Sequence, residues 1–312
     1  MLRRTQTVYV AVDPFLSSRG KVLYRFDRFL AGLAAEQIPC VWMTGWTRAQ
    51  LDEPRRRLGQ NDPYIGENGS AVYLPQDYFH LKGSETMRMG RYTCIPVAKP
   101  QPAATEALDE ISSDLNVSVV PLRKLSQREL SQNTGLPGKE AELVRMRDFD
   151  ELFFFAGASE ADIGGFQAEA KARGLTLERA GPFWSLSCGG DWAKCVRELG
   201  GLYDRALRSH ALRVGVRVAP SGGYGRQARW PAPVFDRVLS LSDSVEPPGQ
   251  TRRADSEGRR GEPSEAAEGT SAESALAAEE PRRQFRLASP TVWEELLASL
   301  ADSAAPTRVH FR

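Results

Sequence analysis

A continuous apolar run near the N-terminus, residues 8–12, most constrains what this 312-residue chain can fold into. A strand that is apolar on both sides must be buried on both faces, as strands of parallel sheets are when helices cover them. Asp13 and Pro14 end the run at once, so it is too short for the apolar core of a signal peptide. We therefore predict a buried first β-strand with a carboxylate at its carboxyl end.

The next segments alternate between helix and strand patterns. Apolar residues recur three and four apart over residues 22–33, a second apolar run covers 38–43, and a polar helix is expected over 48–58. Strand, helix, strand, helix is typical of an α/β fold with a parallel central sheet.

The sequence predicts two domains. Residues 1–80 and 187–245 form the expected core, and residues 81–186, where polar helices alternate with short apolar runs, form an α+β cap. Residues 246–284 contain no aromatic residue and only one large aliphatic residue, Leu276, so we predict a disordered insertion. Residues 285–312 are expected to contain a helix, beginning near Thr291, that docks on the core.

Composition excludes several classes of partner. The formal net charge is +1, so bulk charge indicates no nucleic-acid or anionic-membrane partner. No apolar run approaches the roughly 18 residues of a membrane span.

The cysteines form no C-x-x-C pair, so we expect buried thiols of a cytoplasmic protein; they are Cys40, Cys94, Cys188 and Cys195.

Several stretches resemble the mannosyl-3-phosphoglycerate phosphatase family, of the haloacid dehalogenase (HAD) superfamily. They are DPYIGENGSAVYLP at 62–75, TGLP at 134–137 with RDFDELF at 147–153, GPFWSL at 181–186 with GDWAKCV at 190–196, and the SP–W ending at 289–293. The resemblance implies a Rossmann-like core with an inserted cap. It also implies Mg²⁺ and the removal of phosphate from a sugar phosphate through an aspartyl-phosphate.

Asp13 stands where the resemblance places the nucleophilic carboxylate, which also binds the metal. Alternatively, Asp13 only begins a turn before Pro14. The general acid of the family lies two residues later, where this chain has Phe15, which cannot transfer a proton. If the register moves by two residues, Asp13 becomes the acid and Ala11 the nucleophile, so the pair is broken either way. Loss of a general acid costs about 10²–10⁴ in rate.

Thr44 is the expected phosphoryl-binding hydroxyl after the second strand, and alternatively a helix N-cap. The lysine that neutralises the nucleophile aligns with Trp192. Lys194 lies about 200° further around a helix. It is a candidate catalytic lysine only if the helix start is irregular, and otherwise a surface residue.

The carboxylates that would hold magnesium are missing, because no Asp or Glu lies between Arg205 and Phe235. Mg²⁺ is therefore implied by the resemblance, with Asp13 as its ligand, but is expected to bind poorly. The Gly-rich loop at 220–226 contains an arginine and either binds an anion or is a solvated loop.

Arg147, Glu151 and Asn68 are the expected substrate-binding residues, although Arg147 and Glu151 fit an interdomain ion pair equally well. The expected function is hydrolysis of mannosyl-3-phosphoglycerate or a related phosphorylated sugar, weak or absent here. The alternatives are a catalytically inactive protein that binds an anionic metabolite or a protein partner, and a structural subunit that uses residues 246–284.

Overall fold

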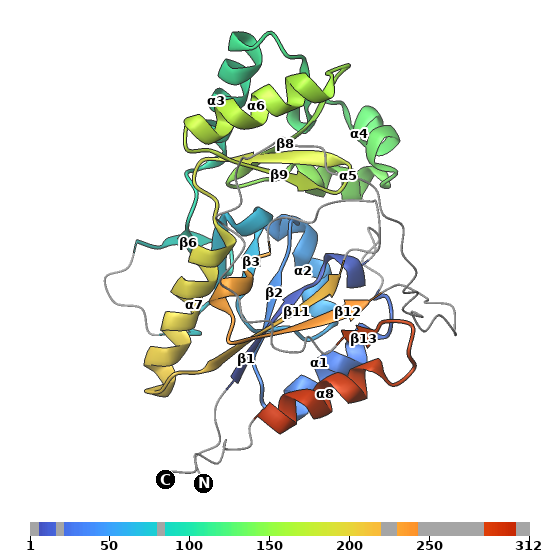
Figure 1. The fold of residues 1–312 in the computed structure, drawn as a ribbon, viewed down its shortest axis with the longest axis vertical. Helices are drawn as coiled ribbons and strands as arrows, with labels where there is room; N and C mark the ends of the chain where they lie inside the picture. The colour runs from blue at the N-terminus through green and yellow to red at the C-terminus, as the bar shows by residue number, and fades with distance from the viewer. Residues whose placement is uncertain (1–5, 17–21, 80–84, 220–229, 243–283, 304–312) are drawn as a thin grey trace, which may run out of the picture.

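Two β-sheets divide the molecule, of which this computed structural model describes residues 6–16, 22–79, 85–219, 230–242 and 284–303. The larger sheet has nine strands in the order β13-β12-β11-β1-β2-β3-β4-β6-β5, and the smaller has four in the order β7-β8-β10-β9. The unit built on the smaller sheet, here called the cap, lies above the larger one, the core (Figure 1). The predicted α/β core with an inserted cap is therefore the fold observed.

The centre of the core is a parallel sheet. β1 (Gln6–Ala11) pairs in parallel with β2 (Cys40–Met43) on one side and with β11 (Leu212–Ala219) on the other. β12 (Arg237–Ser242), β13 (Gln284–Arg286) and β3 (Tyr64–Gly66) extend it in parallel at both sides. The apolar run at 8–12 is buried throughout except at Ala11, as a strand covered on both faces requires.

Three antiparallel strands extend the core sheet beyond β3. They are β4 (Ala71–Pro75), β6 (Tyr92–Pro96) and β5 (Met87–Met89). The predicted start of the cap at residue 81 is therefore wrong, because β5 and β6 belong to the core. The physical reason is aromatic packing: Tyr92 meets the stacked rings of Tyr64 and Tyr73 edge-on, with centroids 5.3 and 6.2 Å away.

Helices cover both faces of the core sheet. The side chains of α1 (Phe26–Ala35), α2 (Arg48–Arg57) and α8 (Val292–Ser303) join one apolar cluster with alternate residues of β1. Those of α7 (Trp192–Leu207) join a second cluster on the opposite face. The 3₁₀ turns of the core are η1 (Asp13–Phe15), η2 (Glu67–Gly69) and η4 (Ala232–Val234).

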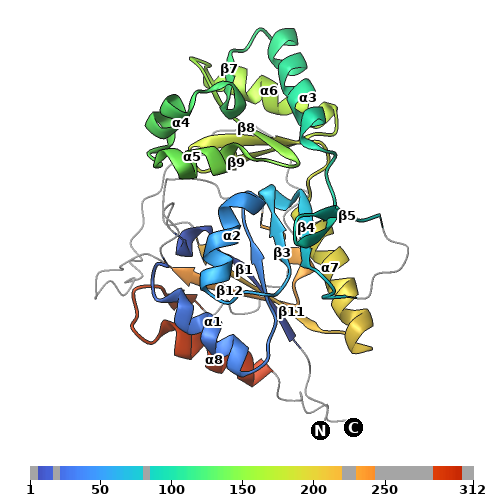
Figure 2. The ribbon, with the colours of Figure 1, turned by 180° about the vertical axis from the view of Figure 1, so that it is seen from behind.

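The cap is a fully antiparallel sheet with helices on both sides (Figure 2). Its strands are β7 (Val119–Pro121), β8 (Asp150–Phe155), β9 (Thr176–Ala180) and β10 (Phe183–Ser187). α3 (Gln101–Asp114) and α6 (Glu160–Ala172) share one apolar cluster with this sheet. A second cluster includes η3 (Leu122–Lys124), α4 (Gln127–Thr134) and α5 (Gly138–Arg145).

The C-terminal helix α8 packs along α1 (Figure 2). Trp293 is its anchor: the indole stacks on Phe29 at 5.1 Å and donates its N–H to the carbonyl of Tyr24 at 2.6 Å. The predicted disordered insertion, 246–284, lies outside the described residues apart from Gln284 in β13, as do residues 304–312 of the predicted C-terminal segment.

The four cysteines are free thiols, three of them buried and Cys188 half-buried. Among the described residues, no helix combines the length and the apolar character needed to cross a membrane.

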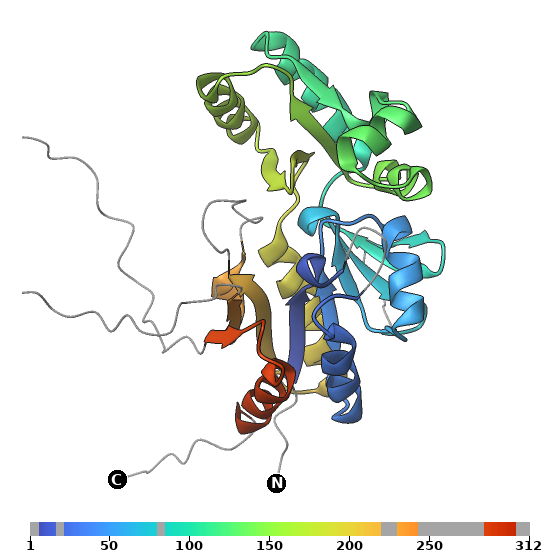
Figure 3. The same ribbon diagram turned by 90° about the vertical axis from the view of Figure 1, so that its right-hand side faces the viewer.

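Figure 3 shows the cap and the core from the side, joined by two passages of the chain.

We expect Trp293→Ala to lower the free energy of unfolding by about 3–5 kcal/mol, because it empties a fully packed aromatic site. Chemical denaturation measures the loss. Glu294→Ala is the matched control on the same helix. The side chain of Glu294 is 55% exposed and only 3.9 Å from Arg28, so its loss should cost less than about 1 kcal/mol. Equal losses in the two variants would contradict the anchoring role of Trp293.

Candidate functional site

A cavity of about 420 Å³ lies between the core and the cap. Its floor is at the carboxyl ends of the parallel strands β1 and β2, the edge at which open α/β sheets bind ligands. The polar lining side chains are those of Asp13, Thr44, Gln50, Asn68, Arg147 and Arg179. The larger apolar ones are those of Met43, Trp46, Leu136, Val144, Leu152, Phe183, Trp192 and Trp230.

Asp13 lies in the turn directly after β1 and opens into this cavity. Its Oδ1 accepts a hydrogen bond from the Thr44 hydroxyl, and its Oδ2 accepts one from the Gly45 N–H at 2.9 Å. A side chain at Gly45 would place Cβ 2.6 Å from the Asn68 Oδ1 atom, so glycine is needed for this close approach. The structure therefore brings together Asp13, Thr44 and Asn68, all three of which the sequence singled out.

The protonation of Asp13 is set by opposing effects. Desolvation by the surrounding protein raises the pKa of this carboxyl group, although the group opens into the cavity. The hydrogen bonds from Thr44 and Gly45 and the positive charge of Arg147 lower the pKa. Desolvation prevails, so the ionised form that a nucleophile needs is disfavoured relative to that of an aspartate in water.

Thr44 is not the N-cap of the following helix. Thr47 caps α2: its hydroxyl accepts from the Gln50 N–H at 3.1 Å, and the Gln50 side chain accepts from the Thr47 N–H at 3.0 Å. The Thr44 hydroxyl instead accepts from the Trp46 N–H at 3.0 Å while donating to Asp13. Of the two alternatives for Thr44, the site position is the one that the structure supports.

Phe15, at the expected place of the general acid, points away from the cavity. The side chain is fully buried, stacks on Phe26 at 4.7 Å and meets Trp293 edge-on at 5.5 Å. It does not line the cavity. A core aromatic residue therefore takes the place of a proton donor.

The lysine position is also changed. Trp192 begins α7, lines the cavity and donates its indole N–H to Glu178 of the cap at 3.2 Å. Asp191 caps the helix by accepting from the Lys194 N–H at 3.0 Å, so the helix start is regular. The Lys194 side chain is exposed and does not line the cavity. Because the helix start is regular, the structure does not bring the predicted catalytic Lys194 to the site.

Arg147 forms a buried ion pair with Asp150, a residue that the sequence did not single out. Both Nε and Nη2 donate to the Asp150 carboxylate, with Nη2 2.9 Å from Oδ2, and Nη2 also donates to the Gly45 carbonyl at 2.8 Å. Asp150 Oδ2 further accepts from Asn68 at 2.9 Å and from Ser185 at 2.5 Å. Asp150 and its neighbour Glu151 are both buried carboxylates of β8, so the sequence alone does not indicate which of the two pairs with Arg147.

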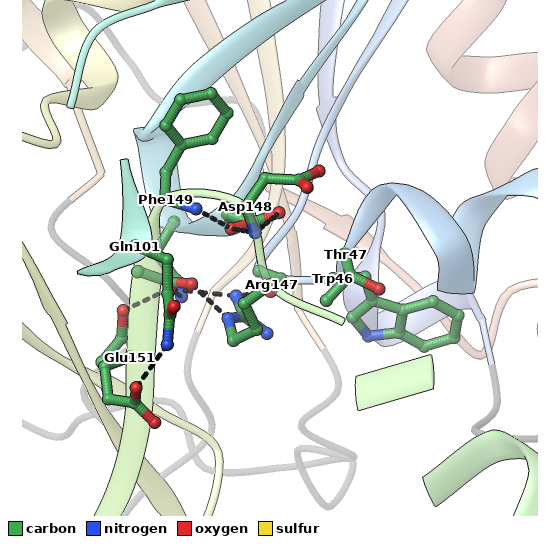
Figure 4. Close-up of polar contacts among 12 residues, drawn as sticks. Trp46, Thr47, Gln101, Arg147, Asp148, Phe149 and Glu151 are labelled. Atoms are coloured by element: carbon green, nitrogen blue, oxygen red, sulfur yellow. Dashed lines mark hydrogen bonds and ion pairs between the residues drawn. The ribbon is translucent and has the colours of Figure 1, made fainter. Parts of the chain in front are cut away.

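Glu151 does not reach the cavity. It is buried inside the cap, where its Oε2 accepts from Gln101 at 2.6 Å (Figure 4). The same oxygen accepts from Thr105 at 2.8 Å and from Arg123 at 3.0 Å. Successive residues of a strand point to opposite faces, so Asp150 and Glu151 cannot both face the core. The predicted substrate contact of Glu151 and its ion pair with Arg147 are therefore corrected.

A second buried carboxylate, Glu67, clamps the chain segment that enters β8. It accepts from the N–H of Asp148 at 2.9 Å and from that of Phe149 at 2.8 Å (Figure 4). Burial raises the pKa of Glu67 to about 8, reinforced by the charges of Asp150 and Asp148 and opposed by that of Arg147. Together with the Arg147 contacts, this clamp joins the cap to the turns that hold Asp13.

The residues that the structure describes do not form a magnesium site. Within the described ranges no group of three His, Cys, Asp or Glu residues could hold a metal ion. Asp13 is the one carboxylate among the described lining residues. The nearby carboxylates of Asp150 and Glu67 do not line the cavity and accept hydrogen bonds from protein donors. The predicted anion loop, 220–226, lies outside the described residues and contains no carboxylate.

We expect the stability of the protein to fall as pH rises from about 4.5 to about 8, since folded Glu67 retains its proton over this window while an unfolded glutamate loses it. The slope contributed by one group is at most about 1.4 kcal/mol per pH unit. Glu67→Gln should flatten this part of the curve, as measured by denaturation at a series of pH values. Glu53→Gln, on the exposed side of α2, should leave the slope unchanged; an unchanged slope in Glu67→Gln would contradict the assignment.

Comparison with curated proteins finds sugar-phosphoglycerate phosphatases. The chain is 27% identical over 171 residues to the glucosyl-3-phosphoglycerate/mannosyl-3-phosphoglycerate phosphatase of Methanococcoides burtonii, and 26% identical over 182 residues to that of Persephonella marina. It is 24% identical over 175 residues to the mannosyl-3-phosphoglycerate phosphatase of Pyrococcus furiosus. These matches cover 55%, 57% and 56% of this chain and 62%, 65% and 69% of the relatives. No protein-family model matches.

Solved structures with a similar arrangement include a haloacid dehalogenase-like hydrolase from Bacillus subtilis, with a TM-score of 0.48 and 16% identity over 76% of this chain and 95% of that one. A HAD subclass IIB sugar phosphatase has a TM-score of 0.46 and 14% identity, over 76% and 94% of the two chains. The resemblance predicted from the sequence motifs is confirmed: the chain is similar to the mannosyl-3-phosphoglycerate phosphatases, and it has a Rossmann-like core with an inserted cap.

Proposed function

We propose that this protein binds a small molecule in the cavity between core and cap without hydrolysing a phosphate ester. The observation that carries the proposal is the place of Phe15, which is buried among Phe26 and Trp293 instead of beside Asp13. Hydrolysis through an aspartyl-phosphate is accelerated about 10²–10⁴-fold by a group that gives a proton to the leaving oxygen. Phe15 has no proton to give and does not face the cavity.

The charges around Asp13 support the same proposal. Phosphoryl transfer is catalysed mainly by positioning and by neutralising the phosphate oxygens. Here Arg147 is already neutralised by Asp150, Lys194 is exposed outside the cavity, and Trp192 contributes no charge. A phosphate dianion about 4 Å from ionised Asp13 would meet a repulsion of a few kcal/mol at an effective dielectric constant near 20.

Hydrolysis of mannosyl-3-phosphoglycerate or a related phosphorylated sugar is the second candidate function. The names of the curated relatives favour it, as does the hydrogen-bonded pair of Asp13 and Thr44. In this case Asp13 attacks phosphorus to form an aspartyl-phosphate, and Thr44 holds a phosphoryl oxygen. We also propose a cytoplasmic location, in keeping with four cysteines that form no disulfide.

We expect the purified full chain to hydrolyse 4-nitrophenyl phosphate in saturating magnesium far more slowly than the usual enzymatic range of about 1–10³ s⁻¹. Phe15→Asp should not restore turnover and should destabilise the fold, because it puts a carboxylate into an apolar cluster. Restoration should require Trp192→Lys and a carboxylate in the 220–225 loop as well, since these groups act as a unit.

Phe15→Leu is the control for the loss of packing, and circular dichroism shows which variants remain folded. The wild-type rate decides between the two candidate functions even if Phe15→Asp does not fold. Wild-type turnover within the usual range would refute the proposed binding function.

A further inference from the structure

We infer that a second cavity, at the carboxyl end of α2, binds a small tetrahedral oxyanion such as sulfate or phosphate. This cavity has a volume of about 190 Å³, and its lining includes Arg55, Arg56, Gln60, Asn61, Arg91 and Tyr92. No described residue lines both this cavity and the one between core and cap. The two sites are therefore separate, and anion binding at the second does not depend on the proposed function.

Arg55, in the wall of the second cavity, is a buried cation whose donors are only partly used. The residue is 1% exposed, and its Nη2 donates to the backbone carbonyl of Asp62. Its Nε and Nη1 have no hydrogen-bond partner within the described part of the chain. The Asp62 carboxylate is engaged elsewhere, because it accepts from the Cys40 N–H at 2.8 Å and from the Tyr78 hydroxyl at 2.9 Å. Burying a charge is costly unless it is paired and hydrogen-bonded, so Arg55 lacks a negative partner.

Aromatic rings offset part of this buried charge. The guanidinium carbon of Arg55 lies 4.6 Å from the ring centroid of Tyr64 and 5.5 Å from that of Trp42. Such contacts attract the positive charge, but they leave Nε and Nη1 without an acceptor. Buried donors in native proteins are nearly always satisfied by protein groups, ordered water or an ion. Because Arg55 also lines a cavity, a bound anion can supply both the acceptor and the negative charge.

The charge of the lining favours an anion. Its charged residues are three arginines, and no aspartate or glutamate is among the described lining residues. Arg56 pairs with Glu53, and Arg91 pairs with Asp52 at 3.1 Å. The side chains of both pairs are about half exposed or more, so solvent weakens these pairs. Arg55 adds a charge that no carboxylate pairs with, which leaves the lining with a net positive charge.

The arrangement of the donors favours a tetrahedral anion over a planar carboxylate. Arg55 comes from α2, and Arg91 directly precedes β6, so their side chains belong to different elements. One guanidinium can bind two oxygens of a carboxylate or of a phosphate. A tetrahedral dianion has further oxygens for the second arginine and for the side-chain amides of Gln60 and Asn61.

The test measures binding of sodium sulfate and of sodium acetate to the full chain by titration calorimetry, with sodium chloride holding the ionic strength constant. Sulfate has the shape of phosphate and is not the product of a phosphatase. We expect sulfate to bind the wild-type protein more tightly than acetate does. Arg55→Met should weaken sulfate binding at least about tenfold, a difference of about 1.4 kcal/mol. Replacing a buried charge by an apolar residue of similar size often preserves stability, and circular dichroism checks that the variant is folded.

Three further arginine variants make the same change of charge. Arg57→Met, on the exposed side of α2 and outside the lining, should bind sulfate as the wild type does. Arg179→Met removes a cation from the cavity between core and cap and should also leave binding unchanged. Arg91→Met, at the exposed rim of the second cavity, should weaken binding several-fold, and it tests the site even if Arg55→Met does not fold.

Three results would overturn the second site. The first is that wild-type protein does not bind sulfate, or binds acetate equally well. The second is that the Arg55 and Arg91 variants bind sulfate as tightly as the wild type. The third is that Arg179→Met abolishes binding while Arg55→Met retains it, which would place the anion between core and cap.

Discussion

The buried ion pair between Arg147 and Asp150 is the interaction on which the site depends. Asp150 begins β8, and Arg147, in the short segment between α5 and β8 of the cap, reaches the carbonyl of Gly45 in the core. Burial of two charges is costly unless hydrogen bonds satisfy their donors and acceptors. Asn68 and Ser185 help to meet this need by donating to the Asp150 carboxylate. The pair fixes the roof of the cavity relative to its floor, and Glu67 reinforces it through the backbone of Asp148 and Phe149.

The ion pair also engages the charge of Arg147, one of the two arginines among the described lining residues of the cavity between core and cap. Arg147 commits its Nε and Nη2 donors to the contacts between cap and core. Asp13 lies in a desolvated site and accepts hydrogen bonds from Thr44 and Gly45. Among the described residues it has no partner with which to hold a metal ion. This cavity thus holds Asp13 beside Thr44 and Gly45, and the charge of Arg147 is paired with that of Asp150.

Phe15 connects the proposed absence of hydrolysis to the stability of the fold. Its ring completes the aromatic cluster through which Trp293 of α8 packs on α1. A carboxylate at this position, turned toward the cavity, would remove one aromatic ring from that cluster and leave a void. Protein interiors tolerate few voids. The same residue therefore stands where the sequence motifs predict a proton donor and helps to hold the C-terminal helix.

The sequence by itself determined the α/β core, the cap, the meeting of Asp13 with Thr44, and the changes at Phe15 and Trp192, because strand periodicity and short motifs are local properties of the chain. Only the tertiary structure decided that β5 and β6 belong to the core, since edge strands this short are recognised by the partner they pair with. It also decided that Asp150, and not Glu151, pairs with Arg147, and that Lys194 lies outside the cavity. Those outcomes depend on which side of a strand or helix faces the partner domain, and this is fixed by packing between segments far apart in the chain.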